Sequence, residues 1–389
     1  SMNRTLLCNV GYVAGIFGPP NSNIMSKTRI SRLAIDQHIK EKLSKTSHKC
    51  VEDVLSLHPL DAMSTLGISH LQYAQLQKQL LQFCLPKCIT AYDLLQSSVD
   101  YRLSFGHKQL DSLLHGGLQP GSITEFTGPA GVGKTQWCMY SAVRTVVDHF
   151  KTNSTSSVVY IDTETAFRPE RVVEILSSKY SELESEIPQL LSKILLYQPT
   201  TVQSLVQILD KLELVVVEKD VKVLIVDSIA SLARKEITPG SSHSNIHRSN
   251  LLSSWAARLK TLAQQLNLTV IVTNQVTSRQ TPNEPQVTEE PLEGEDNATE
   301  GDKQGFLHQF VTPALGNTWT HCVNTRLILQ YRDSNNRQLL IAKSPVAPFA
   351  GFTYSVNHMG ITIQGDSFYS YTGTDPGLLK IKVQKGLTF

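Results

Sequence analysis

The stretch Ser122-Ile-Thr-Glu-Phe-Thr-Gly-Pro-Ala-Gly-Val-Gly-Lys-Thr135 joins a short β-strand pattern, Ile123–Phe126, to a helical pattern that resumes at Lys134. Its glycines and its last two residues follow the spacing G-x-x-x-x-G-K-T. Glycines at this spacing let consecutive backbone N–H groups curve around a phosphate without Cβ clashes. The helix that follows directs its positive N-terminal end at the same anion. The stretch therefore predicts a phosphate-binding loop, and with it a nucleotide site.

The residues of this loop have distinct expected roles. Lys134 would reach the β- and γ-phosphates of a nucleoside triphosphate, and the Thr135 hydroxyl would bind Mg²⁺. ATP and Mg²⁺ are therefore the expected cofactors. The residues expected to contact the nucleotide form one run: Gly128, Pro129, Ala130, Gly131, Val132, Gly133, Lys134, Thr135 and Gln136.

Length and composition limit the classes of protein that the chain can belong to. At 389 residues it is long enough for two domains, the larger with a substantial core. A net charge of +2 gives no global argument for nucleic-acid binding, so such binding would depend on local patches. No run approaches the roughly 18 apolar residues of a membrane span. The 6 cysteines form no CxxC pair, which favours reduced thiols in a cytosolic or nuclear protein.

The chain before the loop divides into three segments. Residues 1–26 are rich in Gly, Asn, Pro and Ser and are expected to form a flexible arm. Residues 27–85 carry short amphipathic patterns and predict a small all-α domain. Within it, Leu66-Gly67-Ile68 followed by Ser69 as an N-cap resembles a helix-hairpin-helix module, which either meets a DNA phosphate or binds another protein. Residues 86–104 are expected to be a linker, extended over 90–94.

Residues 105–365 predict an α/β core. Strands are expected over 123–126, 158–161, 194–197, 221–226 and 268–273, and helices over 135–150, 169–180, 202–217 and 251–266. Uninterrupted apolar strands that alternate with helices indicate a mostly parallel sheet covered on both faces. Closely spaced strands over 324–331, 338–343, 351–356 and 360–363 indicate an antiparallel extension at the sheet edge.

Two further segments depart from this pattern. Residues 276–313 are acidic and proline-containing with few apolar residues, and they are expected to be disordered. Residues 366–389 form a C-terminal tail.

Three polar residues that end apolar strands are the candidates for chemistry. Asp227 ends the 221–226 strand, which we expect beside the strand of the phosphate loop, where its carboxylate would hold a water of the Mg²⁺ shell. Glu164 follows the 158–161 strand, where it could orient and deprotonate an attacking water. Gln275 ends the 268–273 strand and opens the acidic segment, so its amide could sense the γ-phosphate and couple nucleotide state to that segment.

These residues together resemble the RecA family of strand-exchange ATPases in its eukaryotic form. The resemblance covers roughly residues 28–363. Its carriers are Gly128–Thr135, Tyr160-Ile-Asp-Thr-Glu164, Phe167-Arg-Pro-Glu-Arg171, Leu224-Ile-Val-Asp-Ser228 and Thr273-Asn-Gln-Val276. The runs Ala314–His321, Thr325–Leu327 and Leu340–Pro345 look most like the B-type recombinase paralogues. The resemblance implies a RecA-like P-loop ATPase core with a helix-hairpin-helix-like N-terminal domain.

The resemblance also implies roles for individual residues. Arg168 would lie against the adenine, where its planar guanidinium can stack. Glu164 is the implied catalytic base and Gln275 the implied sensor, with Lys134 in the catalytic set. A first DNA loop would run from about Arg234 to Asn250, with Arg234, Lys235 and Arg248 as its positive charges. The 276–313 segment would be the second DNA loop, and Pro345 would cap ATP bound to the adjacent protomer.

Departures from the family's pattern bear on assembly. The family's polymerisation motif has a Phe where this chain has Cys88 in Cys88-Ile-Thr-Ala91. Losing such an anchor costs about 2–4 kcal/mol of pocket filling, enough to weaken self-association a hundredfold or more. Lys343 replaces an acidic ATP-cap residue, and the acidic second loop opposes DNA backbone contact. These departures favour a chain at one end of a hetero-assembly over a homopolymer.

The expected function is that of a regulatory, slowly hydrolysing ATPase in a nuclear paralogue complex that acts on single-stranded DNA in homologous-recombination repair and at stalled forks. The implied partners are the C-type paralogue first, then the D-type and the X-ray-complementing type, the recombinase filament, and single-stranded and branched DNA; no membrane is implied. One alternative is a scaffold that needs ATP only to hold its neighbour. Another is a small-molecule phosphotransferase, for which the sequence has no acceptor-lid signature.

Overall fold

A computed structural model spans the chain and describes residues 33, 35–46, 50–84, 88, 90–97, 101–235, 242–277, 309–332, 336–365, 368–370 and 381–383. Its contacts divide the chain into two compact units, Ser1–Val99 and Asp100–Phe389. None of the described helices combines the length and the apolar character that a membrane crossing requires. The expected flexible arm over 1–26 lies outside the described residues.

The first unit is all-helical around its own apolar core. Its helices are α2 (Gln37–Ser44), α3 (Val51–Leu55), α4 (Pro59–Leu66), α5 (His70–Cys84) and α6 (Ala91–Ser97). The core gathers residues of several helices, among them Leu43, Val54, Leu66 and Leu80. The all-α prediction for this part of the chain is confirmed, although its first described helix begins at Gln37, where Asp36 accepts hydrogen bonds from the next amides.

The helix–glycine–helix arrangement expected around Gly67 is present. Gly67 ends α4 with φ of 55° in the left-handed region, where a glycine is favoured. Ser69 and Gln72 then form reciprocal hydrogen bonds at the start of α5. The only lysine that this structure shows bonded at the hairpin is Lys42, whose Nζ donates to the Gly67 carbonyl at 3.0 Å and so stabilises the end of α4.

The expectation of an extended segment over 90–94 is wrong, because α6 covers residues 91–97. The Thr90 hydroxyl and the Asp93 carboxylate bond to each other at 2.7 Å, and each also accepts from the other's backbone amide. This reciprocal cap satisfies two amides that a short helix otherwise leaves without partners. Cys88, just before it, is exposed and is a free thiol.

The second unit is built on one large sheet in the order β11-β10-β9-β8-β1-β5-β4-β2-β3, with β12 beside β10. The parallel strands are β1 (Ser122–Thr127), β2 (Ser157–Asp162), β3 (Ile194–Tyr197), β4 (Val221–Asp227), β5 (Thr269–Asn274) and β8 (Thr325–Tyr331). The antiparallel strands are β9 (Arg337–Lys343), β10 (Ala350–Asn357), β11 (Gly360–Ile363) and β12 (Tyr369–Ser370).

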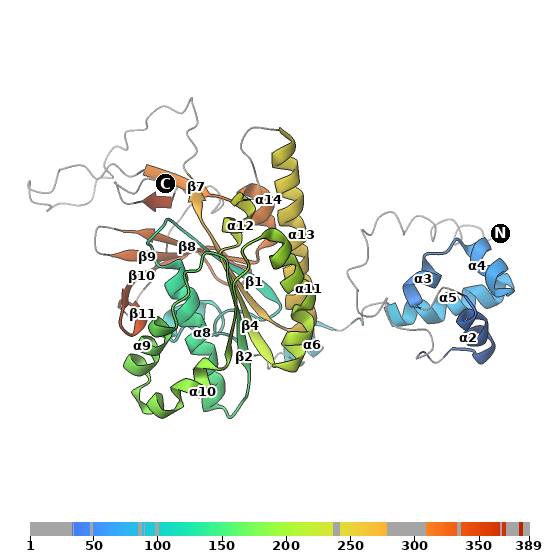
Figure 1. Cartoon of the computed structure of the whole chain (residues 1–389), viewed down its shortest axis with the longest axis horizontal. Helices are drawn as coiled ribbons and strands as arrows, with labels where there is room; N and C mark the ends of the chain where they lie inside the picture. The colour runs from blue at the N-terminus through green and yellow to red at the C-terminus, as the bar shows by residue number, and fades with distance from the viewer. Residues whose placement is uncertain are drawn as a thin grey trace, which may run out of the picture. The chain divides into compact units, whose positions relative to one another are not determined.

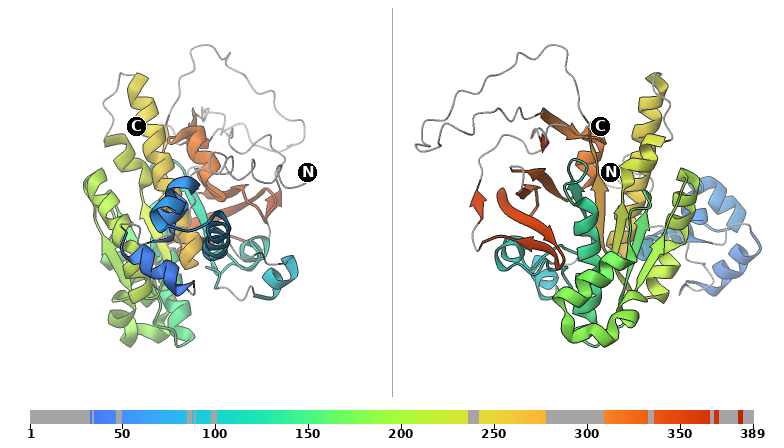
Figure 2. Two further views of the ribbon diagram at one scale, coloured as in Figure 1. Left: turned by 90° about the vertical axis from the view of Figure 1, so that its right-hand side faces the viewer. Right: turned by 60° about the vertical axis from the view of Figure 1, so that its left-hand side comes forward.

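Helices cover both faces of this sheet (Figure 1), and Figure 2 shows the same layers from two other directions. One face packs against α8 (Lys134–Lys151), α9 (Pro169–Lys179) and α10 (Ile187–Leu191), with the 3-10 helix η2 (Ser181–Glu186) between α9 and α10. The other packs against α11 (Val202–Glu218), α12 (Ile229–Lys235), α13 (Ser242–Leu266) and α14 (Gly316–Cys322). The expected α/β class, the parallel core and the antiparallel edge are confirmed.

One expected neighbour relation is wrong. The strand β4, which ends at Asp227, does not lie beside the phosphate-loop strand β1, because β5 pairs with both of them. Every residue of β5 is buried, as a central position in a parallel sheet requires. Which of several equally apolar strands takes the central position depends on pairing between distant segments, which no local pattern encodes.

The expectation of disorder over 276–313 is wrong at both ends of that segment. The strands β6 (Val276–Thr277) and β7 (Gln309–Pro313) pair antiparallel, and β13 (Ile381–Val383) from the C-terminal tail pairs with β7. Backbone hydrogen bonds with a sequence-distant strand give these residues a partner that composition does not reveal. Residues 278–308 lie outside the described chain.

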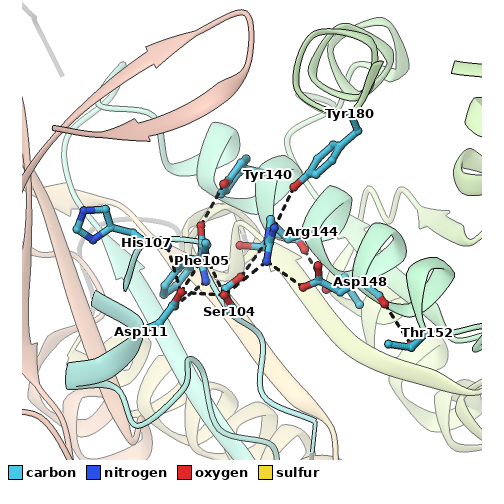
Figure 3. A network of polar contacts seen from close by, with 12 residues as sticks. Ser104, Phe105, His107, Asp111, Tyr140, Arg144, Asp148, Thr152 and Tyr180 are labelled. Carbon is cyan, nitrogen blue, oxygen red and sulfur yellow. Dashed lines mark hydrogen bonds and ion pairs between the residues drawn. The ribbon is translucent and has the colours of Figure 1, made fainter. Parts of the chain in front are cut away.

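A polar network fixes the entry to the second unit against the phosphate-loop helix (Figure 3). Asp111, in α7 (Lys108–Leu113), accepts hydrogen bonds from the Ser104 hydroxyl and from three successive amides, 105–107. Arg144 of α8 donates to the Ser104 carbonyl at 3.3 Å and to the Tyr180 hydroxyl at 3.1 Å. The Tyr140 hydroxyl donates to the Phe105 carbonyl at 3.0 Å. These bonds orient α8, whose first residues belong to the candidate site.

Candidate nucleotide-binding site

The loop between β1 and α8 has the backbone that its glycines predict. A Cβ on Gly128 would lie 2.3 Å from the carbonyl oxygen of Leu329, so only glycine fits between the loop and β8. Gly131 and Gly133 have φ of 75° and 107°, in the region that L side chains rarely adopt. The sequence therefore fixes a concave turn at the C-terminal edge of the sheet, directly before α8.

The mouth of this turn is suited to an anion. Gly133 is the N-cap of α8 and provides no side-chain acceptor for the first helical amides. Those amides carry the partial positive charge of the helix end. The Lys134 Nζ folds over the loop and donates to the carbonyl oxygens of Gly128 and Pro129, each at 2.8 Å. A phosphate in the turn would compete for this ammonium group with a full negative charge, which the two carbonyls lack.

The apolar floor of the loop comes from residues that sequence reasoning did not single out. Val132 is fully buried, and its carbonyl accepts a hydrogen bond from the Tyr354 hydroxyl at 2.7 Å. The Trp137 ring packs edge-on against Tyr354 and stacks against Phe126, with centroids 5.4 and 5.6 Å away. Burial raises the pKa of Tyr354, so its hydroxyl stays a hydrogen-bond donor. Tyr354 is 222 residues from Val132 in the chain, so no local pattern links them.

Asp227, the expected metal-site carboxylate, is buried and held at both oxygens. Its Oδ1 accepts from the Thr273 hydroxyl at 2.6 Å and its Oδ2 from the Tyr160 hydroxyl at 2.8 Å. Burial and the neighbouring Asp227 raise the pKa of Tyr160, which keeps that hydroxyl protonated. Both hydroxyl residues lie in motifs that the sequence analysis quoted, but neither was given a role there.

Glu164 and Gln275 meet, although 111 residues separate them. The Gln275 Nε2 donates to the Glu164 Oε1 at 2.5 Å. Glu164 is held in place by Asp162, whose carboxylate accepts from the amides of Glu164, Ala166 and Phe167 at 3.2, 3.1 and 3.0 Å. The structure thus brings the expected base and the expected sensor into contact at the C-terminal edge of the sheet.

The remaining nucleotide candidates differ in their surroundings. Arg168 is exposed, and its guanidinium donates to the carbonyls of Thr165 and Phe167 at 2.9 and 3.0 Å. The Gln136 Oε1 accepts from the Arg171 Nε at 2.8 Å, so its acceptor atom is engaged within the chain. Arg171, in α9, also donates to the Asn357 carbonyl at 2.5 Å, so it links Gln136 of α8 to the β10–β11 turn. Ala130 is exposed and Thr135 is half-buried at the start of α8.

Both ends of the segment expected to form the first DNA loop are helical in the described structure. Arg234 and Lys235 end α12, and Arg248 lies in α13, which begins at Ser242 and continues to Leu266. The expected loop over 234–250 and a helix beginning at residue 251 are therefore wrong. Residues 242–250 contain no Pro or Gly, so nothing in this run stops α13 from extending back toward Pro239-Gly240.

Lys343, which stands at the ATP-cap position of the resemblance, is engaged within the chain. Its Nζ donates to the carbonyls of Thr320 and Val323, at 2.9 and 2.7 Å, at the C-terminal end of α14. A cation there complements the negative end of the helix. Burial lowers the pKa of this amine. Pro345, two residues further on, is exposed.

The donor set fits ATP with Mg²⁺. The turn has an N-cap glycine without a side-chain acceptor, a second glycine packed against Leu329, and an ammonium group that donates to two loop carbonyls. Within the described residues, no group of three or more His, Cys, Asp or Glu side chains could hold a metal by itself. A magnesium ion carried by nucleotide phosphates and met by one hydroxyl and one oriented carboxylate needs no such group, because Mg²⁺ keeps several waters.

A phosphate loop at a mostly parallel sheet with an antiparallel edge defines a RecA-like P-loop domain. The family described as Rad51 matches residues 97–364, and the chain belongs to that family. DNA repair protein RAD51 homolog 2 of Homo sapiens is 37% identical over 355 residues, which cover 90% of this chain and 92% of the relative. The protein of the same name in Mus musculus is 38% identical over 348 residues, covering 88% and 99%. Its namesake in Arabidopsis thaliana is 26% identical over 362 residues, covering 91% and 95%.

These similarities confirm the recognition made from the motifs. The chain is a homologue of the human and mouse RAD51 homolog 2, the B-type recombinase paralogue. The Rad51 family consists of RecA-type ATPases, which generally use ATP with Mg²⁺. Because the chain belongs to the Rad51 family, and its relatives are named as DNA repair proteins, the similarity supports a place in DNA repair and recombination.

Proposed function

We propose that this protein is an ATP-binding, slowly hydrolysing subunit of a heteromeric recombinase-paralogue complex. It would assist loading of the recombinase on single-stranded DNA in homologous-recombination repair and at stalled forks. The observation that supports the ATPase assignment is the contact between Glu164 and Gln275 at the C-terminal edge of the sheet, from which the phosphate loop also starts. A chain that only bound nucleotide would have no need for a carboxylate and an amide held together there.

Different residues would bind the phosphates, the magnesium ion and the adenine. The amides of the Gly128–Thr135 turn and the Lys134 ammonium would hold the phosphates, and Thr135 with Asp227 would hold Mg²⁺. When bound, Mg²⁺ neutralises charge on the phosphates. Tyr160 and Thr273 keep the Asp227 carboxylate oriented. Arg168 would stack on the adenine, and Gln136 would line the site.

Glu164 would act as the base. Its carboxylate would orient the attacking water and accept a proton from it, which general-base catalysis requires to occur within hydrogen-bond reach. The amide of Gln275 occupies one carboxylate oxygen in this structure, so hydrolysis would require that amide to move toward the γ-phosphate. A base that is engaged by the sensor is consistent with slow, regulated turnover.

Homology to recombinase paralogues supports the proposed partners. The expected neighbour is the C-type paralogue, followed by the D-type and X-ray-complementing paralogues and the recombinase filament, in the nucleus. Single-stranded or branched DNA would meet the basic residues Arg234, Lys235 and Arg248 rather than the acidic segment. The direction of this preference follows from phosphate charge.

A second candidate function is a scaffold that uses ATP only to hold its neighbour. The observation that favours it is the engagement of Lys343 with α14. The Lys343 amine has the opposite charge to an acidic cap residue, and it is bonded to carbonyls of its own chain. The two functions differ in turnover and not in binding.

Replacing Lys134 with alanine tests the nucleotide site. Because the ammonium group is the one fixed charge in the turn, Lys134→Ala should weaken binding of ATP–Mg²⁺ by on the order of 100-fold or more, which corresponds to about 3 kcal/mol. Isothermal titration calorimetry of the purified full chain measures this directly. Lys151→Ala, on the same helix but paired with Glu182 at its far end, is the matched control. Equal affinity in wild type and Lys134→Ala would remove the assignment.

A further inference from the structure

The strand of the phosphate loop contains a buried carboxylate that the proposed chemistry does not use. Glu125 lies in β1, three residues before Gly128, and has no exposed surface. Its Oε1 accepts from the Asn274 Nδ2 at 2.7 Å and from the Trp319 Nε1 at 3.0 Å. Its Oε2 accepts from the Arg326 Nε at 2.5 Å. Three sequence-distant elements, β5, α14 and β8, therefore meet at one side chain.

All members of this cluster are buried. Asn274 and Trp319 have no exposed surface and Arg326 is 1% exposed. A charged pair in such a place gains little net stability over apolar residues, because desolvation offsets the attraction. A buried hydrogen-bonded network does, however, fix the relative position of the elements that carry it. The elements that Glu125 holds together therefore determine its role.

Glu125 accepts hydrogen bonds from residues on either side of the 276–313 excursion, which is the segment that leaves the sheet after β5 and returns before α14. Asn274 is the last residue before Gln275, at the point where the chain leaves the sheet. The chain returns through β7, and the Ala314 amide donates to the Gln275 carbonyl at 2.8 Å. Trp319 follows within α14 and donates to the same oxygen of Glu125 as Asn274 does. Exit and return are thus held at one carboxylate, with Gln275 directly beside the exit.

The same exit also touches the phosphate loop. The Gly128 amide donates a hydrogen bond to the Asn274 carbonyl at 3.4 Å. From this fixed backbone the Gln275 side chain reaches Glu164. Any rotation of residue 274 would move the start of Gln275 relative to both the loop and Glu164.

We propose that Glu125 is a positioning residue that anchors both ends of the 276–313 excursion and thereby sets the place from which Gln275 reaches Glu164. The catalytic consequence rests on the proposed ATPase function, whereas the anchoring is a property of the nucleotide-free chain. Asn274 carries the effect to Gln275, and Trp319 holds the return of the excursion.

Three variants of the full chain separate this role from general stability. Asn274→Ala removes the bond at the exit and leaves the Glu125–Arg326 pair in place. Trp319→Phe removes the bond to the same oxygen at the return. Thr269→Ala is the control, because Thr269 is equally buried on β5 and its hydroxyl has no hydrogen-bond partner within the described structure. Thermal unfolding of each variant shows that it folds.

The first measurement is hydrogen–deuterium exchange without nucleotide. We expect Asn274→Ala to raise exchange at least 10-fold over 274–277 and 314–315, while Thr269→Ala leaves these amides as in wild type. Trp319→Phe should raise exchange in α14 and leave 274–277 protected. Wild-type exchange over 274–277 in Asn274→Ala would overturn the proposal. So would an equal rise there in all three variants, since that reflects lost stability alone.

The second measurement separates kcat from nucleotide affinity. We expect Asn274→Ala to lower kcat at least 10-fold with the Kd for ATP–Mg²⁺ within about threefold of wild type, because the phosphate turn itself is intact. Equal losses of kcat and affinity would contradict a positioning role. If the wild-type chain binds ATP without hydrolysing it, the proposed ATPase function fails, and the exchange measurement alone then decides the anchoring.

Discussion

At the scale of single residues, the site depends on side chains that are held before any nucleotide arrives. The Asp162 carboxylate accepts hydrogen bonds from three backbone amides of the Glu164 loop, and the Asp227 carboxylate accepts hydrogen bonds at both oxygens. Preorganised groups cost less to position at the moment of reaction than groups that must be ordered. Glu164 itself is exposed and bonded to Gln275, so it is the residue on which turnover should depend most.

Replacing Glu164 with glutamine should separate chemistry from binding. The amide keeps the size of the side chain but cannot accept a proton from water, so hydrolysis should fall by on the order of 100-fold or more. Affinity for ATP–Mg²⁺ should stay within a few-fold, because Glu164 is outside the phosphate turn. Single-turnover hydrolysis and calorimetry measure the two quantities. Glu170→Gln, an exposed carboxylate in the next helix, is the control, and equal turnover in wild type and Glu164→Gln would place the base elsewhere.

At the scale of elements, α8 links the site to the packing of the whole domain. Its first turn forms the mouth of the phosphate loop, and its middle is held by the network of Arg144, Tyr140 and Tyr180. Its last turn contains His149, which is buried and packs against the Tyr101 ring with centroids 4.2 Å apart. The His149 Nε2 has no hydrogen-bond partner among the described residues. The end of the helix is therefore built around a neutral imidazole.

This arrangement predicts a pH dependence of stability. Burial lowers the pKa of His149, and Lys222 lowers it further, while Asp220 opposes them. The unfolded chain then binds a proton more readily than the folded chain, so stability should fall as the pH drops below the ordinary histidine value of about 6.5. Thermal unfolding between pH 8 and pH 5 should show a smaller acid-side loss for His149→Gln than for wild type.

The exposed histidine His321 provides the control for this prediction. His321→Gln should keep the wild-type pH dependence, because this exposed side chain lies outside the packing around His149. Identical curves for wild type and His149→Gln would show that the buried imidazole does not govern acid sensitivity.

At the scale of the whole molecule, the question is what the chain assembles with. The Cys88-Ile-Thr-Ala91 segment lacks the aromatic anchor of the family's polymerisation motif, and Cys88 is exposed in this structure. The described structure adds that Ala91 already belongs to α6. A small thiol at this position provides little surface for a partner's pocket.

The chain alone should therefore remain monomeric with saturating ATP–Mg²⁺. Sedimentation velocity over a concentration series would report this, and electron microscopy would reveal any filaments. The same preparation should co-purify with the C-type paralogue in a nucleotide-dependent manner, and Lys134→Ala should reduce that recovery. Regular homofilaments of the wild-type chain would contradict the assignment to one end of a hetero-assembly.

The sequence alone determined whatever local periodicity and turn chemistry can encode. The strand pattern around 158–161, 194–197 and 221–226 matched the observed strands within a residue or so, and the glycine spacing at 128–133 gave the phosphate turn. These features depend on neighbours along the chain, such as a glycine pattern or an apolar run. The family resemblance gave the family and the implied roles of Glu164 as base and Gln275 as sensor.

Contacts between distant segments became visible in the folded chain and not in any local pattern. The tertiary structure placed β5 between β1 and β4, paired β6, β7 and β13, and brought Tyr354 beneath Val132. A signal for one of these contacts was present in the sequence, because Glu125 is a charged residue inside the short strand that leads into the phosphate loop, and a charge buried there needs partners. Its partners are Asn274, Trp319 and Arg326, and the strand order of the sheet places β5 and β8 on either side of β1. Long-range pairing has no local signature, which is the physical reason that composition and spacing could not name them.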